Sequence, residues 1–536
     1  MKSQCYLVLL FLIATHFVLA QKVNVIPYPQ SVVIREGVFE LRKGAIGCSD
    51  ASVMPEALYL KEKLGEQGVT VSARVAKKAP IFLSLEPGSG EKEAYRLEIS
   101  SKQVTVHAAD RAGIFYGVQT LLQMTEAKDG RLSAACCEIG DAPRYGWRGY
   151  MLDESRHFFG KEKVKQLLDY MASYKLNKFH WHLTDESGWR IEIKQYPKLA
   201  TVGGKGNWSD PNCQDVRYYT QEEIKELVAY AAARHIEVIP EIDMPGHATA
   251  ANMAYPELSG GGTPEHPDFT FNVGKEEVYT FLTNVLREVT TLFPSPYLHI
   301  GGDEVSFGIK AWETDPHIQA LMKREGMTKV KEAERYFMHR MTDTVRHLGK
   351  VLVGWDELLD LNVDTARTVI FWWRHDRVYQ LKKSLAGGYA TVMCPRRPLY
   401  FDFIQYTGHK WGRVWSGFCP LEDVYAFPDK GMASWGLPQE QLHLIRGIQA
   451  NLWTERVHNE QRLDYMTFPR MCALAESAWT QPDMKNFDSF SRRMEKAYQA
   501  FDQDGIYYFD HRNPSRHAEP SGPQQKKRDV PMDFRD

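Results

Sequence analysis

From about residue 147 onward, short apolar stretches alternate with longer amphipathic ones, and this alternation restricts the fold more than any other feature. Eight stretches rich in β-branched and aromatic residues predict strands: WRGYML, NKFHWHL, IEVIPEID, YLHIGG, VLVGW, RTVIFWW, ATVMC and IQANLW. Segments with helical spacing lie between several of them, for example 161–174 and 275–293. This alternation predicts a parallel sheet, and eight strands over this length predict a (β/α)8 TIM barrel. A doubly wound open sheet is the alternative, which the lack of a Gly-rich nucleotide turn after the first strand disfavours.

The residues before the barrel follow a different pattern. Period-two alternation predicts four strands, and helical spacing predicts two helices, over 55–67 and 111–125. The strands are expected at 71–76, 81–86, 95–100 and 103–109. This mixture predicts a smaller α+β domain at residues 21–142. The turn-type sequence Asp-Ala-Pro at 141–143 separates it from the barrel, which we place at 143–512.

Both ends of the chain carry signals of their own. Residues 1–20 combine Lys2, a largely apolar run and a Leu-Ala step before Gln21, which together predict a cleaved secretory signal peptide. An uncleaved membrane anchor is the alternative. A cleaved signal predicts export to the periplasm, the outside of the cell or, in a eukaryote, a secretory organelle. Residues 513–536 are polar and Pro-rich, and they predict a disordered tail.

Composition disfavours several classes of function. The net charge of −2 provides no electrostatic basis for binding nucleic acid or an anionic membrane. No segment after the signal is apolar for long enough to span a bilayer. Of the 8 cysteines, Cys5 belongs to the signal, and the widely spaced, odd-numbered remainder does not predict a disulfide framework.

Acidic residues and tryptophans follow nearly every predicted barrel strand. The active site of such a barrel is built at the carboxyl ends of its strands. One acidic residue there is a common helix cap, but this repetition exceeds what capping needs. The residues in question are Asp153, Asp185, Glu241, Asp243, Asp303, Glu304, Trp355, Asp356, Glu357, Trp372, Trp373, Asp402, Trp453 and Glu455. They predict a carboxylate-rich, Trp-lined pocket.

Such a pocket suits a neutral polyol. Carboxylates accept hydrogen bonds from hydroxyl groups, and indole faces cover the C–H faces of a sugar ring. The prediction is therefore glycoside hydrolysis, which normally needs two carboxyl groups beside the scissile bond.

A metal-dependent barrel hydrolase is the competing interpretation. His180 and His182 lie two apart on one strand, so both imidazoles lie on one face, and His247 and Asp303 could complete a metal site. This interpretation explains neither the tryptophans nor the adjacent Asp-Glu pair, so we expect no metal and no cofactor.

Seven motifs in the second domain carry a resemblance to a known family. They are RGYMLDESRHFF (148–159), KFHWHLTDESGWRIEIK (178–194), VIPEIDMPGHATAA (238–251), LHIGGDEV (298–305), VGWDE (353–357), YFD (400–402) and QANLWTE (449–455). In this order they resemble glycoside hydrolase family 20, the β-N-acetylhexosaminidases. The resemblance implies an α+β domain before a (β/α)8 barrel, and exo-hydrolysis of β-linked N-acetylhexosamine glycans. It also implies substrate-assisted, retaining catalysis, in which the 2-acetamido oxygen of the substrate is the nucleophile.

The resemblance implies a role for each matching residue. Glu304 would be the general acid/base, and Asp303 would hold the acetamido N–H and stabilise its developing charge. Tyr400 would donate to the acetamido oxygen, and Asp185 and His247 would form a hydrogen-bonded chain to Glu304. Residues matching sugar contacts and pocket walls are Arg156, Trp355, Trp373, Asp402, Trp415, Trp453 and Glu455, with Trp372 as an alternative to Trp373. Glu241 and Asp243 are interpreted as structural carboxylates.

One departure and one alternative remain. Asp185 begins Asp-Glu-Ser-Gly where the family often has Asp-Asp-Gln-Gly, so the loop shape is expected to differ while the carboxylate is kept. A catalytically silent glycan-binding protein is the alternative function. The sequence decides neither GlcNAc against GalNAc nor the oligomeric state.

Overall fold

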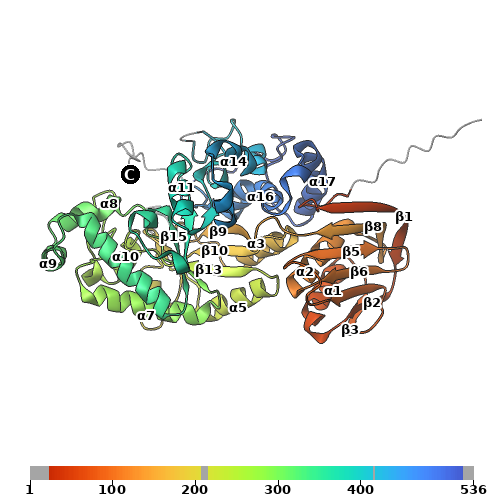
Figure 1. Ribbon diagram of the computed structural model, residues 1–536, viewed down its shortest axis with the longest axis horizontal. Helices are drawn as coiled ribbons and strands as arrows, with labels where there is room; N and C mark the ends of the chain where they lie inside the picture. Colours follow the sequence, from red (N-terminus) through yellow and green to blue (C-terminus); the bar gives the residue numbers. More distant parts are fainter. Residues whose placement is uncertain (1–22, 207–214, 415–416, 523–536) are drawn as a thin grey trace, which may run out of the picture.

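The computed structural model describes residues 23–206, 215–414 and 417–522, and it shows two domains side by side (Figure 1). The predicted signal peptide and residues 523–536 of the predicted tail lie outside the described residues. No helix in the described part is long and apolar enough to cross a membrane.

The second domain is a closed barrel of eight parallel strands, as predicted. All eight predicted strands are present: β9 (Trp147–Asp153), β10 (Lys178–His182), β13 (Glu237–Glu241), β14 (Tyr297–His299), β15 (Val351–Trp355), β16 (Thr368–Trp372), β17 (Ala390–Met393) and β18 (Ile445–Leu452). β18 pairs with β9 and closes the ring. Every residue of β9 is buried, which explains why these strands read as continuous apolar runs.

Helices surround the barrel. The main ones are α3 (Lys161–Ser173), α5 (Gln221–Ala232), α7 (Glu276–Leu292), α10 (Val330–His347), α11 (Val378–Ala386), α16 (Arg470–Trp479) and α17 (Phe487–Gln503). α7 shows how they pack: Val278, Leu282, Val285 and Val289 repeat at three- to four-residue spacing and are fully buried. The apolar stripe of the helix therefore covers the outside of the barrel.

The first domain is a mixed sheet with two helices, in the strand order β1-β8-β5-β6-β4-β2-β3. Its strands are β1 (Ser31–Leu41), β2 (Gly44–Cys48), β3 (Val71–Val75), β4 (Ile81–Leu85), β5 (Tyr95–Ile99), β6 (Val104–Ala108) and β8 (Arg131–Asp141), with β7 (Glu126–Lys128) paired to β8. The helices are α1 (Met54–Glu66) and α2 (Arg111–Met124). β1, β2, β7 and β8 were not predicted; β1 is an edge strand exposed along most of its length and so shows no clean alternation.

A buried polar cluster joins the two domains. Asp141, at the end of β8, accepts hydrogen bonds from Tyr95 Oη at 2.6 Å and from Trp479 Nε1 at 2.9 Å. Lys175, after α3 in the barrel, lies 3.1 Å from the same carboxylate. These side chains are buried, so the charges of Lys175 and Asp141 depend on each other.

The structure differs from the prediction of a disordered tail at residues 513–522, where the chain contacts the barrel. Glu519 accepts hydrogen bonds from the backbone N–H groups of Lys410 and Trp411, and Arg462 donates to the Pro520 carbonyl oxygen at 2.6 Å. These polar groups find partners on the barrel, which composition alone does not reveal.

Candidate active site

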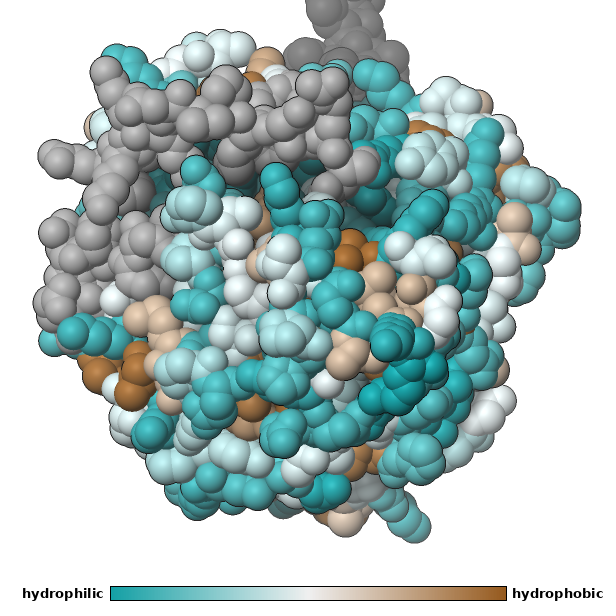
Figure 2. All heavy atoms as spheres, turned by 90° about the vertical axis from the view of Figure 1, so that its left-hand side faces the viewer, coloured by the Kyte–Doolittle hydropathy of each residue, from teal (hydrophilic) through white to brown (hydrophobic). Residues whose placement is uncertain are grey.

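The carboxyl ends of the barrel strands gather the predicted residues at one end of the domain. The short helix α8 (Ser306–Ile309), which follows β14, lies at this end, on the left of Figure 1. Figure 2 shows the molecule from that side, where hydrophilic residues cover most of the visible surface that is not grey.

The turn after β14 brings two neighbouring carboxylates to one place. Gly301, Gly302 and Glu304 all have positive φ, at 67°, 94° and 50°. A β-carbon on Gly301 would lie 1.6 Å from Asp243 Oδ1, so only glycine fits there. Asp243 also accepts from the Gly302 N–H at 3.3 Å. The chain thus leaves the strand geometry that would send Asp303 and Glu304 to opposite faces.

His247 connects these two carboxylates. Its Nε2 atom lies 3.6 Å from Asp303 Oδ2 and 3.6 Å from Glu304 Oε2. Its Nδ1 atom lies 2.9 Å from Asp185 Oδ1. Asp303 is buried, whereas the Glu304 side chain keeps 24% exposure and so remains accessible to a ligand.

The chain of contacts continues deep into the barrel. The second oxygen of Asp185 contacts His182 Nε2 at 2.8 Å, and His182 Nδ1 contacts Glu241. Glu241 also accepts from Trp355 Nε1 at 3.0 Å and lies 2.9 Å from His299 Nδ1. The fully buried carboxylate of Glu241 therefore fixes the orientation of both His182 and Trp355.

Aromatic rings enclose the space beside these carboxylates. The rings of Trp373 and Tyr400 are nearly parallel, 9° apart with centroids at 6.3 Å. Trp453 lies 6.0 Å from Tyr400 and 5.9 Å from Trp355. Glu357 orients Trp373 by accepting from its Nε1 at 3.0 Å. The four rings therefore form one continuous aromatic wall.

Charged side chains occupy another edge of the site. Arg156 lies 2.7 Å from Asp185 Oδ2, and its guanidinium stands 5.1 Å from the Trp453 ring centroid. Arg413, in the loop after β17, contacts both Asp402 and Glu455. Asp402 Oδ1 is buried and has no hydrogen-bond partner in the part of the chain that the structure describes.

The charges around Asp303 and those around Glu455, at the charged edge of the site, shift pKa values in opposite directions. Burial and the carboxylate of Asp243 raise the pKa of Asp303 well above its usual range, and His247 opposes this. Burial disfavours the charged form of His247, but Asp185 and Asp303 outweigh it and raise the pKa of His247 well above its usual range. At the other end, burial opposes ionisation of Glu455, yet Arg413 and Arg156 lower its pKa to about 2.

Comparison with known proteins decides the family. The model of the glycosyl hydrolase family 20 catalytic domain matches residues 145–482, and that of domain 2 of this family matches residues 22–142. The chain belongs to glycosyl hydrolase family 20.

Individual relatives agree with this family 20 assignment. A β-hexosaminidase of Porphyromonas gingivalis is 34% identical over 91% of this chain, which covers 64% of that protein's length. A crystal structure of an exo-β-N-acetylglucosaminidase of Vibrio harveyi with N-acetylglucosamine has a TM-score of 0.84 at 32% identity, covering 91% of this chain and 78% of that one. The β-N-acetylhexosaminidase of Bacteroides fragilis has a TM-score of 0.78 at 31% identity, covering 90% and 96%.

Most residues predicted for the family 20 site come together. Asp185, His247, Asp303 and Glu304 form one contact chain, and Trp355, Trp373, Tyr400 and Trp453 form the aromatic wall. Arg156, Asp402 and Glu455 line the charged edge. Trp415 lies outside the described residues.

The structure also separates the two tryptophans that the sequence left as alternatives. Trp372 is fully buried, packs 5.3 Å from Trp435 and donates to the Arg377 carbonyl oxygen. Trp373, the next residue, faces Tyr400 instead. Neighbouring residues at a strand end point to opposite sides, so only Trp373 reaches the family 20 site.

The histidines of the metal hypothesis are engaged by carboxylates. Both ring nitrogens of His182 contact carboxylate oxygens, so both must be donors and neither has a lone pair for a metal. His180 turns instead to Glu241 and Gln449. Among the described residues, the side chains that could share an ion are grouped differently, with His180 beside Glu241 and His299, and His247 beside either Asp185 and Asp243 or Asp303 and Glu304.

Arg413 is the site residue that sequence reasoning missed. It lies in the Trp- and Gly-rich segment after β17, which has neither strand nor helix periodicity. Asp243 was interpreted as structural, and its place beneath Gly301 is visible only in the folded chain.

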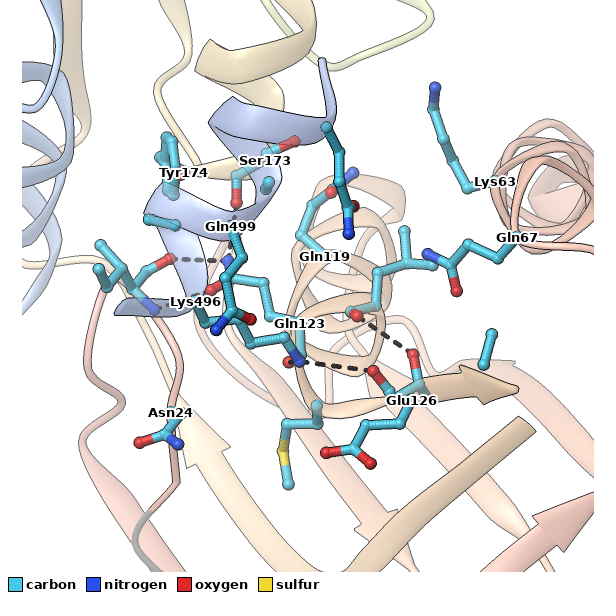
Figure 3. Close-up of a pocket in the computed structure, with 18 of the residues that line it drawn as sticks. Asn24, Lys63, Gln67, Gln119, Gln123, Glu126, Ser173, Tyr174, Lys496 and Gln499 are labelled. Carbon is cyan, nitrogen blue, oxygen red and sulfur yellow. Dashed lines mark hydrogen bonds between the residues drawn. The ribbon is translucent and has the colours of Figure 1, made fainter. Parts of the chain in front are cut away.

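A hollow of about 1520 Å³ lies elsewhere, between the two domains (Figure 3). Gln119 and Gln123 of α2 line it together with Lys496 of α17, which donates to the Gln123 carbonyl oxygen. None of the strand-end residues of the site lines this hollow.

Proposed function

We propose that this protein is an exo-acting, retaining β-N-acetylhexosaminidase that removes terminal non-reducing β-linked GlcNAc or GalNAc from glycans. The observation that carries the proposal is the pair Asp303 and Glu304, held 3.6 Å from one imidazole nitrogen beside an aromatic wall. Membership of family 20 and the names of its relatives support the same activity.

In the first step the substrate supplies the nucleophile. Its acetamido oxygen attacks the anomeric carbon, and the glycosidic C–O bond breaks as Glu304 gives its proton to the leaving oxygen. Asp303, whose ionised form His247 favours, accepts a hydrogen bond from the acetamido N–H and stabilises the positive charge of the oxazolinium ion. Tyr400 donates to the acetamido oxygen and aligns it for attack.

The second step regenerates the enzyme. Glu304, now ionised, takes a proton from water, the resulting oxygen attacks the anomeric carbon, and the bond to the acetamido oxygen breaks. Two displacements at one carbon retain the β configuration. His247 and Asp185 position Glu304 throughout, because the imidazole faces its carboxylate.

Glu304→Gln tests the proposal. We expect a loss of about 10²- to 10⁴-fold in turnover of an aryl β-GlcNAc glycoside, because glutamine cannot transfer a proton. Glu313→Gln, in the 3-10 helix Lys310–Glu313 close by, is the matched control and should keep full activity. Wild-type activity in the Glu304 variant would overturn the assignment.

Two further measurements separate the mechanism from its alternatives. Asp303→Asn should cost about 10²- to 10³-fold, because it removes a charge placed for the transition state. A thiazoline mimic of the intermediate should inhibit, and failure to inhibit would argue against neighbouring-group participation. Binding of glycans without product release would instead favour the silent glycan-binding protein.

We also propose that the chain is exported after cleavage at Ala20, on the pattern of residues 1–20. The mature protein would then begin at Gln21. Amino-terminal sequencing of protein from the exported fraction tests this, and an intact amino terminus would support the uncleaved anchor.

A further inference from the structure

Two carboxylates from different strands share one arginine at the charged edge of the site. Asp402 follows β17 and the short helix α12 (Arg396–Leu399), and Glu455 lies just after β18. Arg413 Nε contacts Asp402 Oδ2, and Arg413 Nη2 contacts Glu455 Oε1. A planar guanidinium offers donors in a fixed fork, so this contact fixes the direction of both carboxylates at once.

The backbone around Arg413 holds it in this place. The Arg413 N–H donates to the Asp402 carbonyl oxygen at 2.9 Å, and the Arg413 carbonyl oxygen accepts from the Ile404 N–H at 3.1 Å. The side chain is only 18% exposed. These backbone hydrogen bonds hold the loop next to Asp402, so the position of Arg413 beside the Asp402 carboxylate is fixed by the fold.

One oxygen of the Asp402 carboxylate remains available to accept a hydrogen bond from a ligand. Arg413 uses Oδ2 of Asp402, while Oδ1 is buried without a hydrogen-bond partner among the residues that the structure describes. An ionised carboxylate only accepts hydrogen bonds, so this oxygen suits a sugar hydroxyl. Burial raises the pKa of Asp402 to about 6 while Arg413 opposes the rise, so the arginine also keeps the carboxylate in its accepting form near neutral pH.

We propose that Arg413 is a specificity-determining residue that aligns Asp402 and Glu455 as acceptors for hydroxyls of the terminal sugar. With the anomeric carbon at Glu304 and the 2-acetamido group at Asp303, the hydroxyls on the far side of the pyranose ring are those at positions 4 and 6. The proposal rests on the proposed function. Arg413 acts through the two carboxylates and does not touch the reacting atoms, so its effect depends on the hydroxyl that each carboxylate receives.

The test combines variants of Arg413 with substrates that lack one hydroxyl. Arg413→Met keeps the length of the side chain and removes its charge; Arg413→Lys keeps the charge and removes the fork. Each variant is assayed on the 4-nitrophenyl β-glycoside of GlcNAc and on its 4-deoxy and 6-deoxy analogues. Arg340→Met is the matched control, because Arg340 pairs with exposed Glu276 on the outside of the barrel.

On the parent substrate we expect Arg413→Met to lower kcat/KM by roughly 10- to 100-fold, mainly through KM, and Arg413→Lys by less. On at least one deoxy analogue the additional loss should shrink to under about 3-fold, because the hydroxyl that needs the aligned carboxylate is gone. Arg340→Met should behave as the wild type on every substrate.

Three results would overturn the proposal. They are an equal fractional loss on all three substrates, which marks a merely structural role, no loss at all, and a loss in kcat alone. If the methionine variant does not fold, the lysine variant decides by the same criterion. If the wild type does not hydrolyse the parent substrate, the proposed function fails, and calorimetric binding of free GlcNAc then decides: affinity weakened by Arg413→Met supports the alignment role, and equal or absent binding overturns it.

Discussion

His247 holds its Nε2 atom 3.6 Å from Glu304 and at the same distance from Asp303, so one imidazole serves both carboxylates of the site. Its other nitrogen contacts Asp185, whose pKa would be raised by burial but is held well below its usual range, first by Arg156 and then by His247. His247 lowers the pKa of both Asp185 and Asp303, whereas Asp243 raises the pKa of Asp303. Replacing His247 and replacing Asp243 should therefore shift the pH dependence of activity in opposite directions.

Replacing His247 by Gln should move the acid limb of activity to higher pH. The imidazolium opposes the rise in the pKa of Asp303, so its removal raises that pKa further and more acid-side activity is lost. We also expect kcat to fall by roughly 10- to 100-fold, because Glu304 loses the charged imidazole that faces it at 3.6 Å. A profile of kcat/KM against pH checks this, and an unshifted acid limb would contradict it.

Replacing Asp243 by Asn should shift the same limb the other way. The carboxylate of Asp243 is the second cause, after burial, that raises the pKa of Asp303. Asparagine keeps an acceptor for the Gly302 N–H and removes the charge, so Asp303 ionises at lower pH. Activity should then persist to lower pH than in the wild type. If the acid limb shifts in the same direction as in the His247 variant, both substitutions act by disturbing the structure and not by changing the pKa of Asp303.

Chelation should leave activity unchanged. Both ring nitrogens of His182 donate to carboxylates, and its pKa is raised well above its usual range because Glu241 and Asp185 outweigh the effect of burial. An imidazolium cannot ligate a metal. Dialysis against EDTA followed by assay tests this. Loss of activity that added zinc restores would revive the metal-dependent hydrolase.

The cluster between the domains should dominate stability. Asp141→Ala leaves Lys175 buried without its carboxylate and takes an acceptor from Tyr95 and Trp479, which should cost about 3–5 kcal/mol in the free energy of unfolding. Chemical denaturation measures the change. The control is Glu276→Gln at the exposed pair with Arg340, which should cost at most about 1 kcal/mol. Equal losses in the free energy of unfolding would mean that the buried cluster stabilises the protein no more than an exposed ion pair does.

The sequence alone determined the barrel, because each of its strands is buried on both faces and therefore appears as a short apolar run. It also placed Asp303, Glu304 and most of their partners at the strand ends, where parallel strands must bring them to one edge. It did not reveal β1, since an exposed edge strand has no apolar face to alternate with a polar one.

Only the tertiary structure decided in which direction the side chains of the site point. The positive φ values of Gly301, Gly302 and Glu304 turn two neighbouring carboxylates toward one imidazole, a geometry that no periodicity contains. The contacts of Arg413 with Asp402 and Glu455 join a loop to the ends of two strands, and only folding brings them together. Burial and neighbouring charge set the pKa values of these groups, and both are properties of the assembled site.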